Sequence, residues 1–226
     1  MKRTFPSELA YVLGLLTLAL GAASMERANF GMSMIVAPAY VLYRKLSLVL
    51  PFFTFGMAEY TVQALLLVVM LLLLRKFRLS FLFSFVSAVV YGLLLDGAMW
   101  LLAFIPMEHF LSRGAGYVIG MLLSSFGVSL MFHTYIAPEV YELFVKELSA
   151  KRQIPIYRFK TAYDIASCLI AIILSFLFFG FGVYVGVRLG TILCAFVNGT
   201  IIGFFSRFLE KRFAFADRLP FRKFFI

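Results

Sequence analysis

Tyr11-Val12-Leu13-Gly14-Leu15-Leu16 returns 106 residues later as Tyr117-Val118-Ile119-Gly120-Met121-Leu122. The same offset, or one residue more, relates further pairs: Gly21 and Gly127, Met25 and Met131, Ala88 and Ala195, and Gly92 and Gly199. A repeat at a nearly constant offset indicates two homologous halves that differ by small insertions and deletions. Halves that each cross a membrane an odd number of times have opposite orientations, and such inverted repeats are typical of transporters.

The composition sets the class of protein. Hydrophobic residues make up 63% of the 226 residues and charged residues only 14%, and the mean hydropathy is +0.98. Too few polar residues remain to cover a soluble fold, so we predict an all-α, multi-pass protein of the cell membrane, in contact with the lipid bilayer. We assign the net charge of +10 to Lys and Arg held by anionic lipids of the inner leaflet. Nucleic-acid binding is not expected, because no polar domain could carry it.

Runs of about 17 to 25 apolar residues are typical of helices that span a bilayer. The sequence contains six such runs, near residues 9–24, 57–74, 79–96, 115–135, 162–179 and 189–206. The third run has an alternative, longer form that continues through Trp100 to Phe104. That longer form would place Asp96 inside the membrane instead of at its edge.

Lys and Arg residues divide unequally between the two sides of the predicted membrane domain. The N-terminus, residues 75–78, residues 146–160 and the tail from Arg207 together hold 16, and the opposite side holds 5. The positive-inside rule then places both termini in the cytoplasm. We predict one transmembrane domain over residues 1–226, with repeat one at about 9–105, repeat two at about 115–210 and a basic juxtamembrane tail at 207–226.

Two segments between the runs are too short to span. Residues 138–148 carry an apolar stripe of Val140, Leu143, Phe144 and Leu148, which predicts an amphipathic helix on the cytoplasmic surface. The matching stretch in the first half, residues 34–50, is more apolar and contains Pro38. It is either a re-entrant half-length helix or an interfacial helix, because non-helical backbone at membrane depth needs cover from protein or water.

Several short motifs carry a family resemblance. Ala28-Asn29-Phe30-Gly31 follows the first run, Lys160 and Asp164 open the fifth, and Gly190-Thr191-Ile192-Leu193 precedes Ala195 and Gly199. This pattern resembles the YczE/YitT-type family of bacterial integral membrane proteins over most of the chain. The resemblance implies a fold and a membrane location more than an activity.

Polar groups within the spans are the candidates for a substrate or ion path, because a charge near the bilayer centre costs about 3 kcal/mol or more. Glu59 and Asp164 occupy almost equivalent positions in the two repeats, and the alternative is that each sits at the headgroup level as a charge near a helix N-terminus. Glu26 to Asn29 interrupts the first run, which is either a pointer to a binding site or a surface Glu-Arg pair. The full set of path candidates is Glu26, Arg27, Asn29, Gly31, Glu59, Asp96, Lys160, Asp164, Thr191 and Asn198.

Small residues at four-residue spacing allow two helix backbones to approach closely in lipid. They occur in both halves, as Ala88 and Gly92 and as Ala195, Gly199 and Gly203. We expect these residues to bring the third and sixth spans together at a pseudo-twofold axis. Asn198 would then lie near the bilayer midplane.

The sequence carries no phosphate-binding loop, no HExxH, no CxxC and no GxSxG motif. We therefore expect no enzyme activity, no cofactor and no metal. Two functions remain: a secondary transporter or exporter of a small solute, or a non-transporting membrane module that recruits a membrane partner, forms a homodimer or regulates membrane-associated biosynthesis. A transporter predicts a polar path to the midplane, and a module predicts a dry core with an exposed apolar docking stripe.

The charge distribution predicts that the loop from Glu108 to Arg113 faces the outside of the cell. A cysteine introduced by Ser112→Cys should react with an impermeant thiol reagent added to intact cells. Labelling only after the cytoplasmic side is exposed would reverse the topology.

Overall fold

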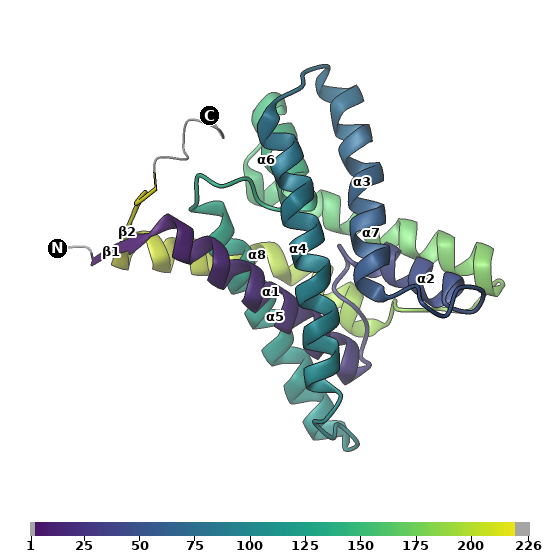
Figure 1. The fold of residues 1–226 in the computed structure, drawn as a ribbon. Helices are drawn as coiled ribbons and strands as arrows, with labels where there is room; N and C mark the ends of the chain where they lie inside the picture. Colours follow the sequence, from purple (N-terminus) through teal and green to yellow (C-terminus); the bar gives the residue numbers. More distant parts are fainter. Residues whose placement is uncertain (1–2, 220–226) are drawn as a thin grey trace.

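The computed structural model describes residues 3–219, without the side chain of Leu79 (Figure 1). Six helices in this part of the chain are long and apolar enough to cross a membrane. The elements follow one another in the order β1 (Arg3–Pro6), α1 (Ser7–Ala28), α2 (Ala37–Leu46), α3 (Phe55–Leu74), α4 (Leu79–Leu102), α5 (Phe110–Phe132), α6 (Val140–Arg152), α7 (Ile156–Phe179), α8 (Leu189–Arg212) and β2 (Phe213–Ala216).

The six predicted spans are confirmed as α1, α3, α4, α5, α7 and α8. Most of them extend beyond the predicted runs at one or both ends. The longer form of the third span is the observed one, since α4 reaches Leu102 and contains Asp96. The predicted tail begins within α8, which ends at Arg212. Arg222 and Lys223 of that tail lie outside the described residues.

The expected interruption of the first span at Glu26 to Asn29 is wrong. Helix α1 continues to Ala28 and ends at Asn29, whose φ of 56° is left-handed. The helix tolerates its charged end because the side chains find partners. Arg27 donates hydrogen bonds to the carbonyl oxygens of Ala103 and Ile105.

The two ends of the described chain lie on the same side of the bundle (Figure 1). Strand β1 pairs with β2 in parallel, with Arg3 opposite Phe213 and Pro6 opposite Ala216. An even number of crossings returns the chain to the face on which it started. The strand pair between the two ends of the chain is therefore consistent with six spans.

Helices α1 and α5 form the closest helix pair, and glycines make this approach possible. A Cβ atom added at Gly21 would lie 2.6 Å from the carbonyl oxygen of Gly120, and one added at Gly127 would lie 2.6 Å from that of Gly14. The N-terminal part of α1 thus meets the C-terminal part of α5, so the two helices run antiparallel. Backbones at this separation gain van der Waals contact that larger residues would prevent.

The remaining helix contacts come in corresponding pairs. Helix α4 packs on α1 as α8 packs on α5, and α3 packs on α4 as α7 packs on α8. The short helices follow the same pattern, since α2 packs on both α3 and α7 while α6 also packs on both. Each half of the chain therefore contributes one long helix to the centre and a similar group around it.

The expectation that the third and sixth spans meet is wrong, because α4 packs mainly on α1 and α3 and α8 mainly on α5 and α7. Gly92 faces the carbonyl oxygen of Gly56 in α3, and Gly199 faces the Thr161 side chain in α7. Ala88 and Ala195 are buried beside them. The small residues therefore pack equivalent helix pairs within each half, while Gly203 has no atom within 4 Å of an added Cβ.

Both short helices have a buried N-terminal half and a more exposed C-terminal half. In α2, residues Ala37–Val41 are buried, in agreement with the half-length alternative for residues 34–50. In α6, residues Val140–Val145 are buried. The prediction of a surface helix at 138–148 is therefore wrong, because α3, α4 and α7 cover α6.

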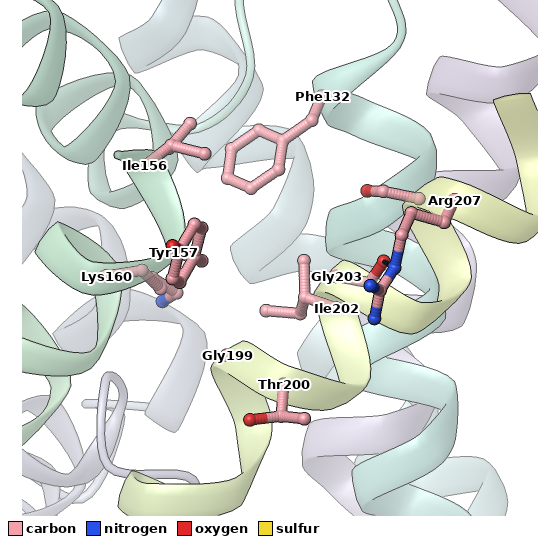
Figure 2. A pocket seen from close by; sticks show the side chains of 10 residues that line it. Phe132, Ile156, Tyr157, Lys160, Gly199, Thr200, Ile202, Gly203 and Arg207 are labelled. Carbon is pink, nitrogen blue, oxygen red and sulfur yellow. Dashed lines mark hydrogen bonds between the residues drawn. The ribbon is translucent and has the colours of Figure 1, made fainter. Parts of the chain in front are cut away.

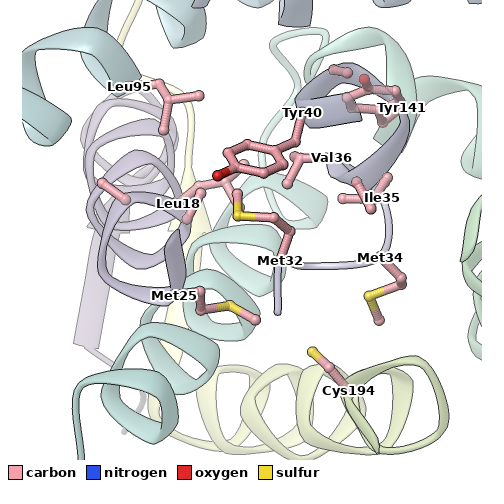
Figure 3. Packing of buried hydrophobic residues seen from close by; sticks show 14 of the residues in the cluster. Leu18, Met25, Met32, Met34, Ile35, Val36, Tyr40, Leu95, Tyr141 and Cys194 are labelled. Carbon is pink, nitrogen blue, oxygen red and sulfur yellow. The ribbon is translucent and has the colours of Figure 1, made fainter. Parts of the chain in front are cut away.

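Methionines line much of the main buried cluster around α1 and the segment that leads into α2. Figure 3 shows Met32 near Tyr40, and Met34 pointing toward Cys194 of α8. Flexible thioether side chains fill the irregular space between helices that cross at several angles. Cys168 and Cys194 are buried free thiols.

Because glycines allow α1 and α5 to approach closely, even a small side chain at one of these glycines should lower the stability of the protein. Gly120→Ala should lower the melting temperature of the purified protein, with a cost of about 1 to 3 kcal/mol typical of overpacking. Gly203→Ala is the matched control in an open position, and it should leave the melting temperature unchanged or raise it. Equal effects of both substitutions would contradict the close approach.

Candidate functional site

A cluster of polar side chains lies buried between α3, α6, α7 and α8. We call it the polar cluster. Each of its members is at most 6% exposed, although they include five ionisable groups. The members are Glu59, Gln63, Glu139, Glu142, Lys160, Asp164 and Asn198.

Lys160 holds the centre of the polar cluster. Its Nζ atom donates a hydrogen bond of 2.9 Å to Asp164 Oδ1, one helical turn further along α7. The same nitrogen lies 3.4 Å from Glu142 Oε1 in α6. The ammonium thus links a spanning helix to a half-length helix through two carboxylates.

Gln63 extends the cluster from α6 toward α3. Its Nε2 donates a hydrogen bond of 3.0 Å to Glu139 Oε2, and its Oε1 accepts one of 2.9 Å from the backbone nitrogen of Val140. The loop before α6 is held from the other side by α4, where Ser84 donates to the carbonyl oxygen of Pro138 and Ser87 to that of Ala137. The start of α6 is therefore fixed by polar contacts on two spanning helices.

Asn198 ends the cluster on the α8 side. It lies beside Asp164, and its Oδ1 accepts a hydrogen bond of 2.7 Å from Ser125 in α5. This places α5, α7 and α8 around one polar position, as expected for an amide in the middle of a span.

Glu59 is fully buried and lacks a comparable partner. Within the described part of the chain, neither of its carboxyl oxygens has a hydrogen-bond partner. Tyr141 and Gln63 approach the carboxyl without reaching hydrogen-bond geometry. Glu59 and Asp164 are both 0% exposed, and their position relative to the headgroup level stays a prediction.

The two glutamates outside the spans show how the cluster affects protonation. Burial raises the pKa of Glu139 from an ordinary value of 4.5 to about 8; the nearby Glu142 adds to the rise, and Gln63 opposes it. Burial also raises the pKa of Glu142, while the Lys160 ammonium acts in the opposite direction. Glu139 therefore changes its charge in the neutral pH range. The Lys160 ammonium compensates the negative charge of Glu142 more than that of Glu139.

A cavity of about 550 Å³ adjoins the cluster between α5, α7 and α8. Figure 2 shows Phe132, Ile156 and Tyr157 on one side of this space and Ile202 and Arg207 on the other. The lining comes from the end of α5, the start of α7 and the later part of α8, so the cavity lies at the end of the bundle that carries the termini. Lys160 is part of its wall, which brings the cavity to the central ion pair.

The other path candidates lie at the opposite end of the bundle. Glu26, Asn29 and Gly31 line a smaller pocket of about 150 Å³ together with Arg44 and Arg188. Tyr40 donates a hydrogen bond of 3.3 Å to Glu26 Oε1. No member of the polar cluster lines this pocket, so the structure does not bring all of the predicted path residues into one cavity.

Three candidates have local structural roles at that end. The Thr191 hydroxyl donates to the carbonyl oxygen of Gly186 and accepts from the backbone nitrogen of Arg188. Arg27 holds the loop after α4. Asp96 accepts hydrogen bonds from Thr54 Oγ1 at 2.7 Å and from the Gly56 nitrogen at 2.9 Å. Arg27 and Arg113 instead donate hydrogen bonds to backbone oxygens.

Gln63, Glu139 and Glu142 were missed by sequence reasoning. The two glutamates were placed on a surface helix because only its apolar stripe was considered. The repeat itself contained the missing signal, since it pairs this helix with the apolar segment 34–50, for which a re-entrant position was one of the two alternatives. An amide in the middle of an apolar run was the signal for Gln63.

The polar cluster does not have the ligand arrangement of a metal centre. Within residues 3–219, no three His, Cys, Asp or Glu side chains are grouped so that they could hold a metal ion. The cluster instead offers one ammonium group, several carboxyl groups and two amides at the edge of a cavity. This arrangement can bind small polar molecules and protons.

The raised pKa of Glu139 predicts how stability depends on pH. The folded protein holds this proton between about pH 4.5 and pH 8, where the unfolded chain has lost it, so this group's contribution to stability falls as the pH rises. Glu139→Gln should therefore flatten the decrease in melting temperature between about pH 5 and pH 8. Glu108→Gln, at an exposed site, should not. Identical slopes for the three proteins would mean that Glu139 titrates normally.

Comparison with known proteins identifies a family whose function is unknown. No curated protein and no solved structure matches the chain. One family model matches residues 5–207, a region that contains the polar cluster and both pockets. The chain belongs to DUF6198, a family of unknown function.

Proposed function

We propose that the protein is a secondary transporter of a small polar solute. The observation that carries this proposal is the Lys160 ion pair, which lies buried inside a membrane domain and at the same time lines a cavity of about 550 Å³. Charged residues within spans are costly and occur mainly along substrate and ion paths. A cavity that reaches such a pair gives a solute access to it.

The chemistry of the pair suggests the class of solute. Lys160 is shared by Asp164 and Glu142, so a solute carboxylate could replace one of them at the ammonium, and a solute amine could bind the released carboxylate. The rest of the cavity wall is largely apolar, with Phe132, Ile156 and Ile202. This combination fits a zwitterion or a short organic ion that carries an apolar group.

The helix arrangement supports an inverted repeat. The sequence repeat relates Gly14 to Gly120 and Gly21 to Gly127, whereas in space Gly14 meets Gly127 and Gly21 meets Gly120. A twofold axis between α1 and α5 produces this exchange. If Gly14 meets Gly127, the repeat counterpart of Gly21, then Gly21 must meet Gly120, the repeat counterpart of Gly14. The antiparallel course of α1 and α5 fits an axis in the membrane plane.

The two half-length helices fit the same proposal. In transporters with inverted repeats, half-length helices often end near the bilayer midplane, where they form part of the binding site. The start of α6 binds Gln63, which lies well inside α3. The carboxyl groups of Glu139 and Glu142 are placed at the N-terminus of α6, where the helix dipole favours negative charge.

The two pockets occupy opposite ends of the bundle. The larger one lies at the end with the termini and reaches the polar cluster, and the smaller one contains Glu26, Arg44 and Arg188. With the termini in the cytoplasm, as the excess of basic residues on that side predicts, this arrangement corresponds to a site open to the cytoplasm. The smaller pocket would then be the outer entrance.

The non-transporting module predicts a dry core, and the buried polar cluster argues against it. The resemblance to the YczE/YitT-type family remains a prediction and names no solute. Transport by an ion gradient therefore agrees best with the cluster and its cavity.

Transport can be tested in proteoliposomes on a solid-supported membrane. Amino acids, short-chain carboxylates and primary amines are applied in turn, and the transient current is recorded. At least one of these classes should give a current with the wild-type protein, and Asp164→Asn should reduce it at least tenfold, because the variant removes the main partner of Lys160.

Glu108→Gln, in an exposed loop, is the control and should retain the current. The variants must elute as monodisperse protein with unchanged melting behaviour. A wild-type protein that gives no current with any of the three classes would favour the membrane module. An Asp164→Asn variant with full current would remove the ion pair from the path.

A further inference from the structure

We propose that the polar cluster is a proton-binding site in which Glu59 carries a proton at neutral pH and Glu139, which accepts a hydrogen bond from Gln63, takes up and releases a second proton. This inference rests on the proposed function only for the role of the proton as coupling ion. The binding of protons itself follows from the burial and the partners of the carboxyl groups.

The environment of Glu59 does not support a carboxylate anion. The side chain is 0% exposed, and within the described residues both of its oxygens lack a hydrogen-bond partner. An ionised carboxylate in such a place is strongly disfavoured, and a buried group without a partner neutralises instead. Proton binding converts it to the neutral acid by forming one O–H bond.

The titratable groups around Glu59 do not include a cation that would replace the proton. Tyr141 faces it from α6 and Glu139 from the preceding loop, and Tyr91 faces it from α4. Tyr163 lies between Glu59 and Asp164 on the α7 side. From α2, Tyr40 and Tyr43 stack on Phe55, one turn before Glu59. Each of these groups is neutral or acidic.

The charge balance of the whole cluster leads to the same conclusion. Four carboxyl groups, those of Glu59, Glu139, Glu142 and Asp164, face the single ammonium group of Lys160. Of these four carboxyl groups, those of Glu142 and Asp164 form ion pairs with Lys160. Three uncompensated negative charges in a buried site would be far more costly than two bound protons. Protons on Glu59 and Glu139 leave a net charge of only minus one.

A proton fits this site better than a metal cation. Hard cations require six or more oxygen ligands at short distances, whereas the described residues contain no grouping of three acidic, His or Cys side chains that could hold a metal. The nearest amide, Gln63, already uses its oxygen to accept from Val140 and its nitrogen to donate to Glu139. The space beside Glu59 therefore lacks a coordination shell.

Glu139 is suited to proton exchange because it changes charge near neutral pH, where its pKa lies at about 8. Gln63 lies between it and Glu59 and cannot hold the proton itself. The deprotonated Glu139 would disfavour a negative charge on Glu59, because two nearby carboxylates repel each other. A proton taken up on one side of the membrane and released on the other would couple solute movement to the proton gradient.

Infrared spectroscopy of the protein in lipid vesicles tests proton binding without a solute. A buried protonated carboxyl group gives a C=O stretching band that a carboxylate lacks. The wild-type protein at pH 7 should show this band. Its frequency should shift when the glutamates are labelled with carbon-13, and it should stay the same when the aspartates are labelled instead. Above about pH 8, where Glu139 has lost its proton, Glu59→Gln should lack the band that the wild-type protein keeps, and Glu108→Gln should keep it.

Each result decides the proposal. A wild-type protein without the band at pH 7, a band that follows labelled aspartate, or a band that persists in Glu59→Gln above about pH 8 would overturn it. Loss of the band on addition of sodium chloride at constant pH would assign the site to sodium instead. If Glu59→Gln does not fold, the carbon-13 labelling and a pH titration decide, because Glu139→Gln should remove the part of the signal that titrates near pH 8.

The two proposals can fail separately. A glutamate band without any solute current would support the proton site and remove the transporter. A solute current without the band would retain the transporter and exclude the proton from this site.

Discussion

The Lys160 ammonium group constrains the arrangement of the helices around it. A lysine that is 2% exposed within a membrane domain is tolerated only beside negative charges, and its two partners come from different elements, Asp164 in α7 and Glu142 in α6. Asp164 lies one turn away on the same helix and needs no tertiary structure. Glu142 reaches the ammonium only if α6 leaves the surface and enters the bundle. The ion pair and the buried position of α6 therefore require each other.

Burying a half-length helix in this way raises a second constraint. The backbone at the start of such a helix has free N–H groups, which lipid cannot satisfy. At α6 the Val140 nitrogen donates to Gln63, and serines of α4 donate to the carbonyl oxygens of Ala137 and Pro138. The polar residues of α3 and α4 thus serve the backbone as well as the cluster. Replacing them with apolar residues would leave the loop before α6 without partners.

The sequence predicted the elements better than their packing. Apolar runs identify spans because bilayer thickness sets their length, and all six were found. Helix α1 was expected to end early at Glu26 because charge was taken as a boundary, yet Arg27 and Glu26 find partners at the helix end. Which helices meet was not predictable from small residues alone. Gly92 and Gly199 allow close approach, but their positions do not identify the neighbour, which is α3 for one and α7 for the other.

Sequence reasoning likewise found only some of the residues of the candidate site. Burial cost identifies Glu59, Lys160, Asp164 and Asn198, because each is an unusual residue within an apolar run. It does not identify Glu139 and Glu142, since outside a span the same residues are ordinary on a surface. Only tertiary packing makes them unusual.

Departures from the repeat help to form the cavity of about 550 Å³ beside α8. An offset of 107 relates Gly92 to Gly199 and therefore Asp96 to Gly203. In the first half the Asp96 side chain fills the space beside α3 by binding Thr54 and Gly56. In the second half Gly203 has no side chain, an added Cβ would meet no atom within 4 Å, and this residue lines the cavity. At an offset of 104, Gly56 corresponds to Lys160. One half thus places a carboxylate against backbone and closes the helix pair, while the other leaves the same position open and puts an ammonium group at its wall.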